Sequence, residues 1–326
     1  MKRSSLTCCA VLALLACAEQ TPSPSADKLV TATQDSWRVA PQSGLNDFFN
    51  CLKNEGVSLV SAHRGGPTPG FPENAIETMA HILTAAPAIM EIDVATSADG
   101  ILYLMHDDTL GRTTTGSGDA DRLSWSNLKT LNLEDNDGQR TDFAPSRFDD
   151  ALAWAKGRTV LQVDFKQSTA YEDVTKEIYR QGAEDRVILI AYSMASARKL
   201  HRLAPEVMIS LSVGSQSELN RAVAAGIPAD RLIGFTGTQS PRPRLFSLLD
   251  DREIEVIFGT LGGRNSIDRE IAATGDEDRY GDLAAQGVDI IATDRPIQAH
   301  HALDIAGRAP SGTTSICGIS PPADGR

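Results

Sequence analysis

Short runs of apolar and β-branched residues recur nine times between residues 57 and 293, and stretches with helical spacing separate most of them. The runs lie at 57–62, 89–94, 101–105, 160–165, 187–191, 207–213, 231–235, 254–258 and 288–292. Strands that alternate with helices in this way are typical of a parallel sheet covered by helices. Eight such repeats close into a barrel, so the sequence predicts an α/β fold, a (β/α)8 TIM-type barrel, in a single domain.

Nine candidate strands compete for eight places in this barrel. The connection 95–100 is too short for a helix, so 101–105 is either a barrel strand without its crossover or a hairpin extension. The run 231–235 is the other candidate for exclusion. No break in composition divides the chain, although its length of 326 residues alone would suggest two domains.

The predicted helices lie between these strands, and several of them end on a glycine, which suits a helix C-terminus. They cover residues 75–86, 146–156, 171–181, 194–203, 215–225 and 276–286. A long polar segment separates His106 from Val160. Within a barrel, this segment is predicted to form an extended loop on the active-site face, with a short helix at 124–131.

The N-terminus reads as a targeting segment. A basic start precedes an apolar run of about ten residues, half of the roughly 20 that a spanning helix needs. Residues 1–16 are therefore predicted to be a signal peptide. The run ends Leu-Leu-Ala-Cys at Cys17, which resembles a bacterial lipobox and implies acylation of that cysteine. The alternative is an ordinary signal peptide cut nearby, with Cys17 a bystander.

These features predict the organisation of the whole chain. Residues 17–45 are expected to form a lipidated cysteine and flexible tether, 46–306 the barrel, and 307–326 an irregular tail. The protein is expected in the periplasm or anchored to the outer membrane. Disulfides persist there, so Cys51 and Cys317 are expected to form a bridge, the alternative being two unpaired thiols.

The net charge is −12, with 43 acidic and 31 basic residues, and the sequence contains no basic run. Such a chain repels phosphate backbones, which argues against nucleic acid as a partner. A small-molecule substrate is favoured, and membrane contact is expected only through the N-terminal lipid anchor.

Charged and imidazole side chains lie at or near the C-terminal ends of the predicted strands, where barrels place their catalytic residues. They are His63, Arg64, Glu91, Asp93, His106, Asp164 and Lys166. The three carboxylates are hard oxygen ligands, suited to Ca²⁺ or Mg²⁺ and poorly suited to Zn²⁺. The arginine and lysine can neutralise a phosphate, and the two imidazoles can take and give a proton. Together these groups are what cleavage of a phosphodiester requires.

Seven short motifs then occur in an order that resembles the glycerophosphodiester phosphodiesterase family over about residues 57–300. They read His-Arg-Gly-Gly from His63, Pro-Glu-Asn from Pro72, Glu-Ile-Asp from Glu91, His-Asp from His106, Arg-Thr-Thr from Arg112, Asp-Phe-Lys from Asp164 and Ala-Thr-Asp-Arg-Pro from Ala292. The resemblance implies metal-dependent hydrolysis of a glycerophosphodiester to sn-glycerol 3-phosphate and an alcohol. It also implies a divalent cofactor, Ca²⁺ or Mg²⁺.

The resemblance further implies roles for single residues. His63 and His106 match the acid–base pair, which acts through a cyclic-phosphate-like route, and Arg64 matches the arginine that stabilises the phosphate. Glu91 and Asp93 match two metal ligands.

Three further residues are placed by the same resemblance. Asp164 stands where the family usually has Glu as third metal ligand, and Lys166 matches the lysine two residues on. Glu73 matches a loop beside the first histidine, with a supporting role in substrate binding. The segment 258–262 departs from the aromatic-Thr-Val-Asn run that the family often has, which bears on its glycerol contacts.

Two alternatives to this function stay open. One is a sibling phosphodiesterase or phospholipase D-like enzyme acting on lysolipids or sphingolipids, and the other is a non-catalytic binding lipoprotein. Separately, Asp294 is predicted to cap the last helix by accepting from its first N–H groups, with Pro296 in the first turn.

Overall fold

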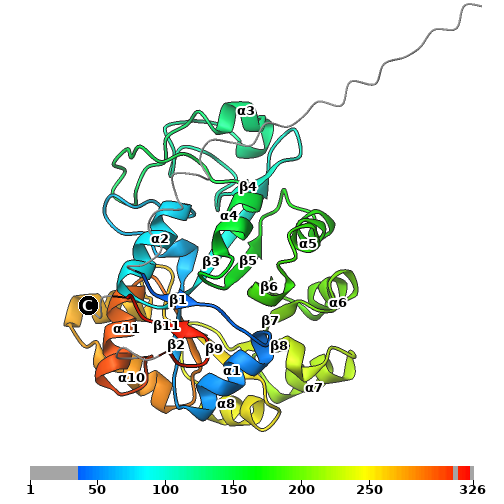
Figure 1. The fold of residues 1–326 in the computed structure, drawn as a ribbon, viewed down its shortest axis with the longest axis vertical. Helices are drawn as coiled ribbons and strands as arrows, with labels where there is room; N and C mark the ends of the chain where they lie inside the picture. The colour runs from blue at the N-terminus through cyan, green and yellow to red at the C-terminus, as the bar shows by residue number, and fades with distance from the viewer. Residues whose placement is uncertain (1–35, 311–314, 324–326) are drawn as a thin grey trace, which may run out of the picture. The chain divides into compact units, whose positions relative to one another are not determined.

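The structure, a computed structural model, describes residues 36–310 and 315–323. Within these residues, one sheet contains eight parallel strands that close into a barrel, because β2 pairs with both β10 and β3. The eight are β2 (Leu59–Ala62), β3 (Ala88–Thr96), β5 (Leu161–Phe165), β6 (Val187–Ala191), β7 (Met208–Ser212), β8 (Leu232–Phe235), β9 (Glu255–Gly259) and β10 (Ile290–Thr293). Helices surround this barrel, as Figure 1 shows, so the predicted (β/α)8 fold is confirmed.

A helix follows each barrel strand. These helices are α2 (Ile76–Ala85), α4 (Phe148–Ala155), α5 (Tyr171–Arg180), α6 (Met194–Leu203), α7 (Gln216–Ala224), α8 (Pro243–Asp250), α10 (Asp278–Ala285) and α11 (Pro296–Ile305), with α9 (Ile267–Thr274) preceding α10. Their apolar spacing explains their docking: α5, for example, buries Val174 and Ile178, which lie four residues apart on one face. Serine side chains cap the N-termini of α6 and α7.

The structure decides differently on the two uncertain strands, 101–105 and 231–235. β4 (Leu102–Leu104) pairs antiparallel with β3, so the run 101–105 is a hairpin extension. By contrast, β8 pairs with β7 on one side and β9 on the other, so the run 231–235 is a barrel strand.

The interior of the barrel is apolar at its N-terminal end. Inward side chains such as Ile89, Ile188 and Ile257 form one cluster there with the buried face of α1 (Leu45–Asn54), including Phe48 and Phe49. α1 therefore closes the N-terminal end of the barrel, and the C-terminal end carries the polar side chains.

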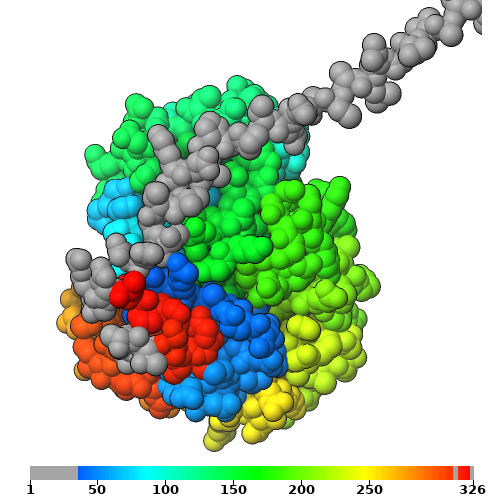
Figure 2. All heavy atoms as spheres, viewed as in Figure 1, coloured from blue at the N-terminus to red at the C-terminus, as the bar shows by residue number. Residues whose placement is uncertain are grey.

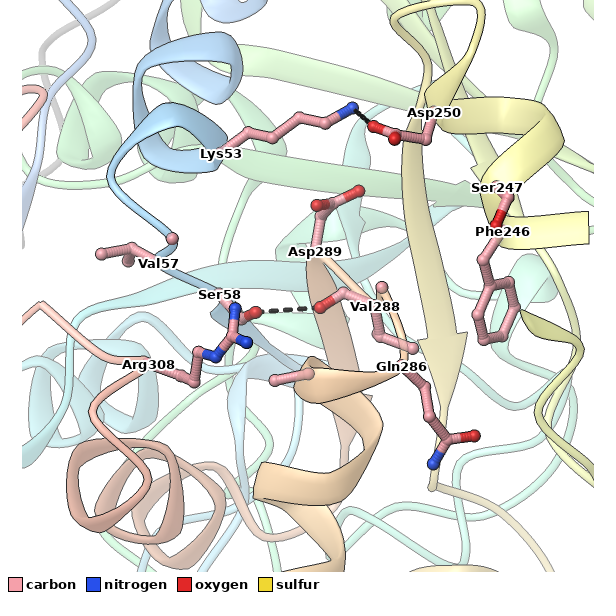
Figure 3. A pocket seen from close by; sticks show the side chains of 13 residues that line it. Lys53, Val57, Ser58, Phe246, Ser247, Asp250, Gln286, Val288, Asp289 and Arg308 are labelled. Atoms are coloured by element: carbon pink, nitrogen blue, oxygen red, sulfur yellow. Dashed lines mark hydrogen bonds and ion pairs between the residues drawn. The ribbon is translucent and has the colours of Figure 1, made fainter. Parts of the chain in front are cut away.

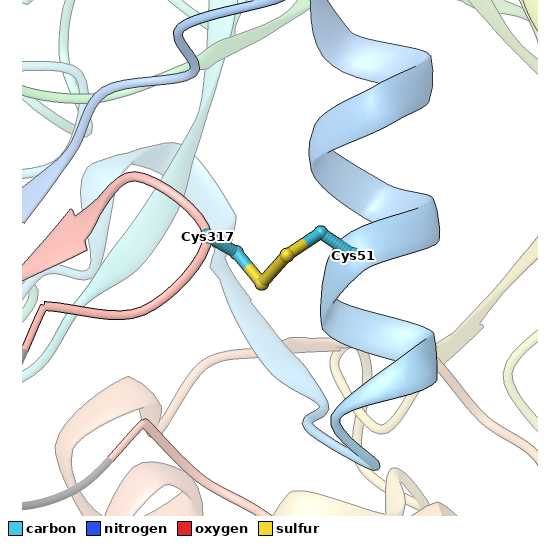
Figure 4. The surroundings of a disulfide bond; sticks show 2 residues. All are labelled: Cys51 and Cys317. Carbon is cyan, nitrogen blue, oxygen red and sulfur yellow. A yellow bond between two sulfur atoms is a disulfide. The ribbon is translucent and has the colours of Figure 1, made fainter.

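The described ends of the chain lie side by side. β1 (Arg38–Val39) pairs antiparallel with β11 (Ile319–Ser320), and Figure 2 shows the red C-terminal segment against the blue N-terminal one. A disulfide joins Cys51 on α1 to Cys317, 266 residues later (Figure 4). The expected bridge is thus confirmed. Both strands of this small sheet lie in segments predicted to have no regular structure, the tether 17–45 and the tail 307–326. They were not predicted because strands of two residues leave no recognisable pattern in a sequence.

The bridge closes a very long loop, so its removal should destabilise the protein. Replacing both Cys51 and Cys317 by serine is expected to cost about 2–5 kcal/mol, because the unfolded chain regains the entropy that the closed loop removes. Thermal melting of the double variant against the oxidised wild type measures this. A reduced wild type should melt with the variant, and equal melting of all three forms would contradict the expectation.

A cavity of about 210 Å³ lies at the N-terminal end of the barrel, away from the predicted site. Figure 3 shows Lys53 reaching toward Asp250, with Asp289 beside them, and Lys53 forms an ion pair with Asp250. Burial raises the pKa of Asp289 to about 6. Nearby, Glu255 is 1% exposed and lies two residues before the inward Ile257, on the same face of β9. Neither of its carboxylate oxygens has a hydrogen-bond partner among the described residues.

Glu255 is expected to make stability depend on pH. Burial raises its pKa to about 8, against about 4.3 for a glutamate in an unfolded chain. Between about pH 4.3 and pH 8 the native state keeps a proton on Glu255 that the unfolded chain has lost. The free energy of unfolding therefore falls as the pH rises through this range. Glu255→Gln should remove this fall in stability and make the protein about 1–3 kcal/mol more stable than the wild type at pH 8. Melting curves from acidic to alkaline pH test this, with Glu206→Gln, at an exposed position, as the control that should leave the pH dependence unchanged.

The segment between β4 and α4 packs with Tyr103 of β4 in a second apolar cluster, to which it contributes Leu110 and Leu128. It contains the short helix α3 (Trp125–Leu128), shorter than the predicted 124–131. The predicted signal peptide, Cys17 and residues up to 35 lie outside the described residues. Among those described, no helix has the length and apolar character needed to cross a membrane.

Candidate active site

The inward faces of three neighbouring strands carry polar groups above the apolar floor. Ser61 on β2 donates a hydrogen bond to Gln162 on β5 at 2.9 Å, forming a polar layer inside the barrel. Glu91 and Asp93 follow the inward Ile89 at intervals of two residues on β3, so they point the same way. The parallel register pairs Asp93 with Asp164 on β5.

The structure brings together the three carboxylates predicted as metal ligands. One oxygen each from Glu91, Asp93 and Asp164 lies within 4.8 Å of the others, so the cluster could hold a divalent ion. Burial and the charge of Asp93 raise the pKa of Glu91 to about 8, and the same two causes raise that of Asp164. Repulsion of this kind is what a bound cation relieves, so these residues fit such an ion. Asp164 reaches the cluster although it is one methylene shorter than Glu.

Asp93 is held in place by two other predicted motifs. Asn74 donates from its side chain to Asp93 Oδ2 at 2.8 Å and accepts from the Asp93 N–H at 2.9 Å. Lys166 donates to Asp93 Oδ1 at 3.1 Å and to Asp164 at 3.4 Å. The ammonium therefore lies beside the carboxylate cluster.

Arg64 and Asn74 have left-handed backbone conformations, with φ of 53° and 57°. This conformation is costly for arginine and allows the Arg64 N–H to donate to Glu91 Oε2 at 2.7 Å. The Asn74 N–H in turn donates to the Arg64 carbonyl at 2.8 Å. The turn after β2 thus supports one ligand of the cluster directly.

His63 follows β2 and is oriented from the far end of the chain. Its Nδ1 donates to Asp294 Oδ1 at 2.7 Å, so Nε2 is the ring nitrogen that this hydrogen bond leaves open. Burial lowers the pKa of His63, but the hydrogen bond to Asp294 and the charge of Glu91 outweigh it, so the pKa lies above its usual value. The prediction that Asp294 caps the last helix is wrong, because its other oxygen accepts from the Gly262 N–H at 3.1 Å and Arg295 is the N-cap of α11. Pro296 in the first turn is confirmed.

Asp294 is itself fixed by a buried carboxylate that no motif indicated. Asp268, 1% exposed, accepts from the Asp294 N–H at 2.7 Å, from the Thr293 hydroxyl at 2.9 Å and from the Tyr280 hydroxyl at 2.7 Å. A fully hydrogen-bonded group of this kind rigidifies its surroundings. His63 is thereby linked to α9 and α10.

His106 is oriented by its neighbour in the sequence. Its Nδ1 donates to Asp107 Oδ1 at 2.6 Å, and Arg112 donates to both oxygens of Asp107, at 2.6 and 2.9 Å. The hydrogen bonds from Arg112 hold the pKa of Asp107 well below its usual range. Asp107 therefore stays ionised and fixes the imidazole.

Glu73, predicted to support substrate binding, lies between two guanidinium groups. Both its oxygens accept from Arg112 at 2.8 Å and from Arg64 at 3.1 Å, and the side chain is 4% exposed. This buried carboxylate links the loop of His106 to the arginine beside His63.

A model of the glycerophosphoryl diester phosphodiesterase family matches residues 63–298. The chain belongs to this family. The matched stretch begins at His63 and ends within α11, so it contains all of the residues predicted for the site.

Individual relatives and solved structures resemble the chain as well. The chain is 30% identical over 158 residues to the uncharacterized protein YqiK of Bacillus subtilis, covering 46% of this chain and 65% of that one. It is 26% identical over 161 residues to a glycerophosphodiester phosphodiesterase of Caldanaerobacter subterraneus, covering 47% and 66%. These matches span less than two thirds of either curated relative. A solved glycerophosphoryl diester phosphodiesterase from Parabacteroides distasonis has a TM-score of 0.80 at 28% identity, covering 88% of this chain and 99% of that one.

Four charged residues of this family member take part in the site without having been predicted to do so. They are Asp107, Arg112, Asp268 and Asp294. Asp107, Arg112 and Asp294 lie within motifs of the family, but the motifs do not show which residues they contact. Asp268 carries no signal in the sequence.

Proposed function

We propose that this protein hydrolyses glycerophosphodiesters to sn-glycerol 3-phosphate and an alcohol. The observation that carries the proposal is the convergence of three carboxylates, two oriented imidazoles, an arginine and a lysine at one end of the barrel. Membership of the glycerophosphoryl diester phosphodiesterase family supports it.

Each group has a part in the proposed reaction. Glu91, Asp93 and Asp164 would hold Ca²⁺ or Mg²⁺, which supplies Lewis-acid polarisation of a phosphoryl oxygen when bound. Arg64 and Lys166 neutralise the remaining phosphate charge. Glu73 positions Arg64, since both of its oxygens are already occupied by guanidinium groups.

The two imidazoles would move the protons. In the proposed route, one imidazole takes the proton of a glycerol hydroxyl as that oxygen attacks phosphorus, and the other gives a proton to the departing alcohol oxygen. The P–O bond to the alcohol breaks and a cyclic phosphate forms. Water then opens the ring with the two roles reversed, which restores both imidazoles. Asp294 and Asp107 keep His63 and His106 in the orientations that these transfers need.

A sibling enzyme of lysolipids or sphingolipids is less well supported. Such substrates require an apolar mouth, and large apolar side chains that are exposed within the described residues are few. They are Tyr179, Tyr192, Val223 and Ile305, of which Tyr192 alone contacts the carboxylate cluster, through Asp164. A non-catalytic binding protein would be expected to have lost part of the site, and each predicted side chain is present.

We further propose that the protein is exported and held by a lipid on Cys17, in the periplasm or at the outer membrane. The signal-like residues 1–16 support this, and so does the disulfide, which persists in oxidising compartments.

The function is tested by incubating the purified protein with glycerophosphocholine, with and without EDTA. Glycerol 3-phosphate should appear without EDTA, vanish with it, and return when Ca²⁺ or Mg²⁺ is added back. No release from any glycerophosphodiester would overturn the proposal, and full activity in EDTA would overturn its metal dependence.

A further inference from the structure

Asp294, the residue that orients His63, is held from two sides. Its Oδ2 accepts from the Gly262 N–H at 3.1 Å, and its own N–H donates to Asp268 Oδ2 at 2.7 Å. Gly262 lies in the loop after β9, and Asp268 lies in the first turn of α9. The carboxylate and the backbone of Asp294 are therefore both fixed by residues outside the seven motifs.

Further hydrogen bonds join the start of α9 to the end of β10. The Asp268 N–H donates to the Thr260 carbonyl at 2.9 Å, and the Thr260 N–H donates to the Ala292 carbonyl at 2.8 Å. The Thr293 hydroxyl donates to Asp268 Oδ1 at 2.9 Å. The start of α9 and the end of β10 thus form one hydrogen-bonded unit, and the residue that follows this end of β10 is the partner of His63.

Asp268 is a costly residue to place in this unit. It is 1% exposed, and its three donors, the Asp294 N–H and the hydroxyls of Thr293 and Tyr280, are all uncharged. A buried carboxylate without a cationic partner is expensive in free energy, so stability alone does not explain its presence. The start of the helix does not require it either, because the side chain of Ser266 already caps α9.

We propose that Asp268 is a positioning residue for the reaction, which acts through Asp294 to hold the His63 imidazole in its reactive orientation. The inference rests on the proposed function and adds a residue to it. Two hydrogen bonds of 2.7 Å each connect Asp268 to Asp294 and Asp294 to His63. A displacement of reacting groups by about 1 Å can lower a rate by about 100-fold, so the position of Asp294 matters for proton transfer by His63.

The location of Asp268 separates its effect from that of the metal site. The carboxylates that converge there lie on β3 and β5, whereas the side chain of Asp268 contacts β10, the residue after it, and α10. Loss of the Asp268 side chain should therefore lower turnover and leave the binding of Ca²⁺ or Mg²⁺ unchanged. A general loosening of the barrel end would weaken both.

The test measures kcat and KM for glycerophosphocholine, and the calorimetric Kd of Ca²⁺ and Mg²⁺, in the full-length protein. Asp268→Ala should lower kcat by about 10–100-fold, with KM and Kd within about twofold of the wild type. Asp268→Asn keeps an oxygen for the Asp294 N–H and should lose less than about fivefold. Ile271→Ala, at a fully buried position on the same helix, is the control that should lower the melting temperature and leave kcat unchanged.

A second comparison tests whether the effect passes through His63. In a His63→Ala background, Asp268→Ala should cause no further loss beyond about twofold, because the group that Asp268 positions is absent. Tyr280→Phe removes a single donor to Asp268 and should lower kcat by about two- to fivefold, again without effect in the His63→Ala background. This milder variant decides the question if Asp268→Ala does not fold.

The outcomes separate this inference from the proposed function. An unchanged kcat in whichever of Asp268→Ala and Tyr280→Phe folds would overturn it, as would an equal loss with and without His63. A metal affinity that falls in step with kcat would also overturn it, since Asp268 would then support the barrel end as a whole. An inactive wild type would overturn the proposed function, and the role of Asp268 with it.

Discussion

Replacing His106 by alanine is expected to lower kcat for glycerophosphocholine hydrolysis by about 10²–10⁴-fold with little change in KM. The imidazole is held by Asp107 at 2.6 Å and lies among the groups that would contact the phosphodiester. Removing it takes away a proton transfer while leaving the carboxylates and Arg64 to bind the substrate. His63→Ala should have an effect of the same order, since Asp294 orients His63 in the corresponding way.

The double variant gives a further test of this pair. Because the two imidazoles act in one proton-transfer sequence, the loss in the double variant should be far smaller than the product of the single losses. His301→Ala, in an exposed position on α11, is the control and should retain full activity. Retention of more than about one tenth of the activity in either single variant would contradict the assignment.

The second large effect is expected on metal binding. Glu91→Gln should abolish the thermal stabilisation that Ca²⁺ or Mg²⁺ gives the wild type, which amounts to about 2.7 kcal/mol at a hundredfold excess over Kd. It should also reduce hydrolysis by at least about 100-fold. One of the three converging carboxylates is lost, and the oxygen that accepts from the Arg64 N–H is replaced by an amide. Glu206→Gln, in an exposed position, is the matched control.

The pH dependence of metal binding tests whether Glu91 is one of the metal ligands. The pKa of Glu91 is raised to about 8, so below that pH the site holds a proton that the cation must displace. Affinity in the wild type should therefore fall by up to tenfold for each pH unit between about pH 8 and pH 6. Titration calorimetry over this range measures it. An affinity that does not change with pH would contradict the assignment of Glu91.

Much of the fold could be predicted because the signal is local. Barrel strands bury both faces, so their apolar runs stand out, and the helices between them show an amphipathic spacing. The choice between β4 and β8 could not be made locally, because pairing decides it: β4 meets β3 antiparallel, whereas β8 has a parallel neighbour on each side.

The part of the site that lies on the strands could be predicted from the sequence. Glu91 and Asp93 share a face by period two, and Asp164 joins them through strand register. Asp294 was misassigned because its contact with His63 spans 231 residues, and a local reading of Thr-Asp-Arg-Pro gives a helix cap instead. Asp268 and Glu255 were missed for the same reason, since burial and partners decide what a lone carboxylate does.

The bond that is cleaved tests the central claim most directly. Phosphorus NMR of a glycerophosphocholine digest distinguishes glycerol 3-phosphate from phosphocholine and from a cyclic phosphate. The account predicts glycerol 3-phosphate with an equal amount of choline, formed by the wild type and absent with His106→Ala. Phosphocholine as the product, a cyclic phosphate that persists, or an unchanged substrate would contradict it.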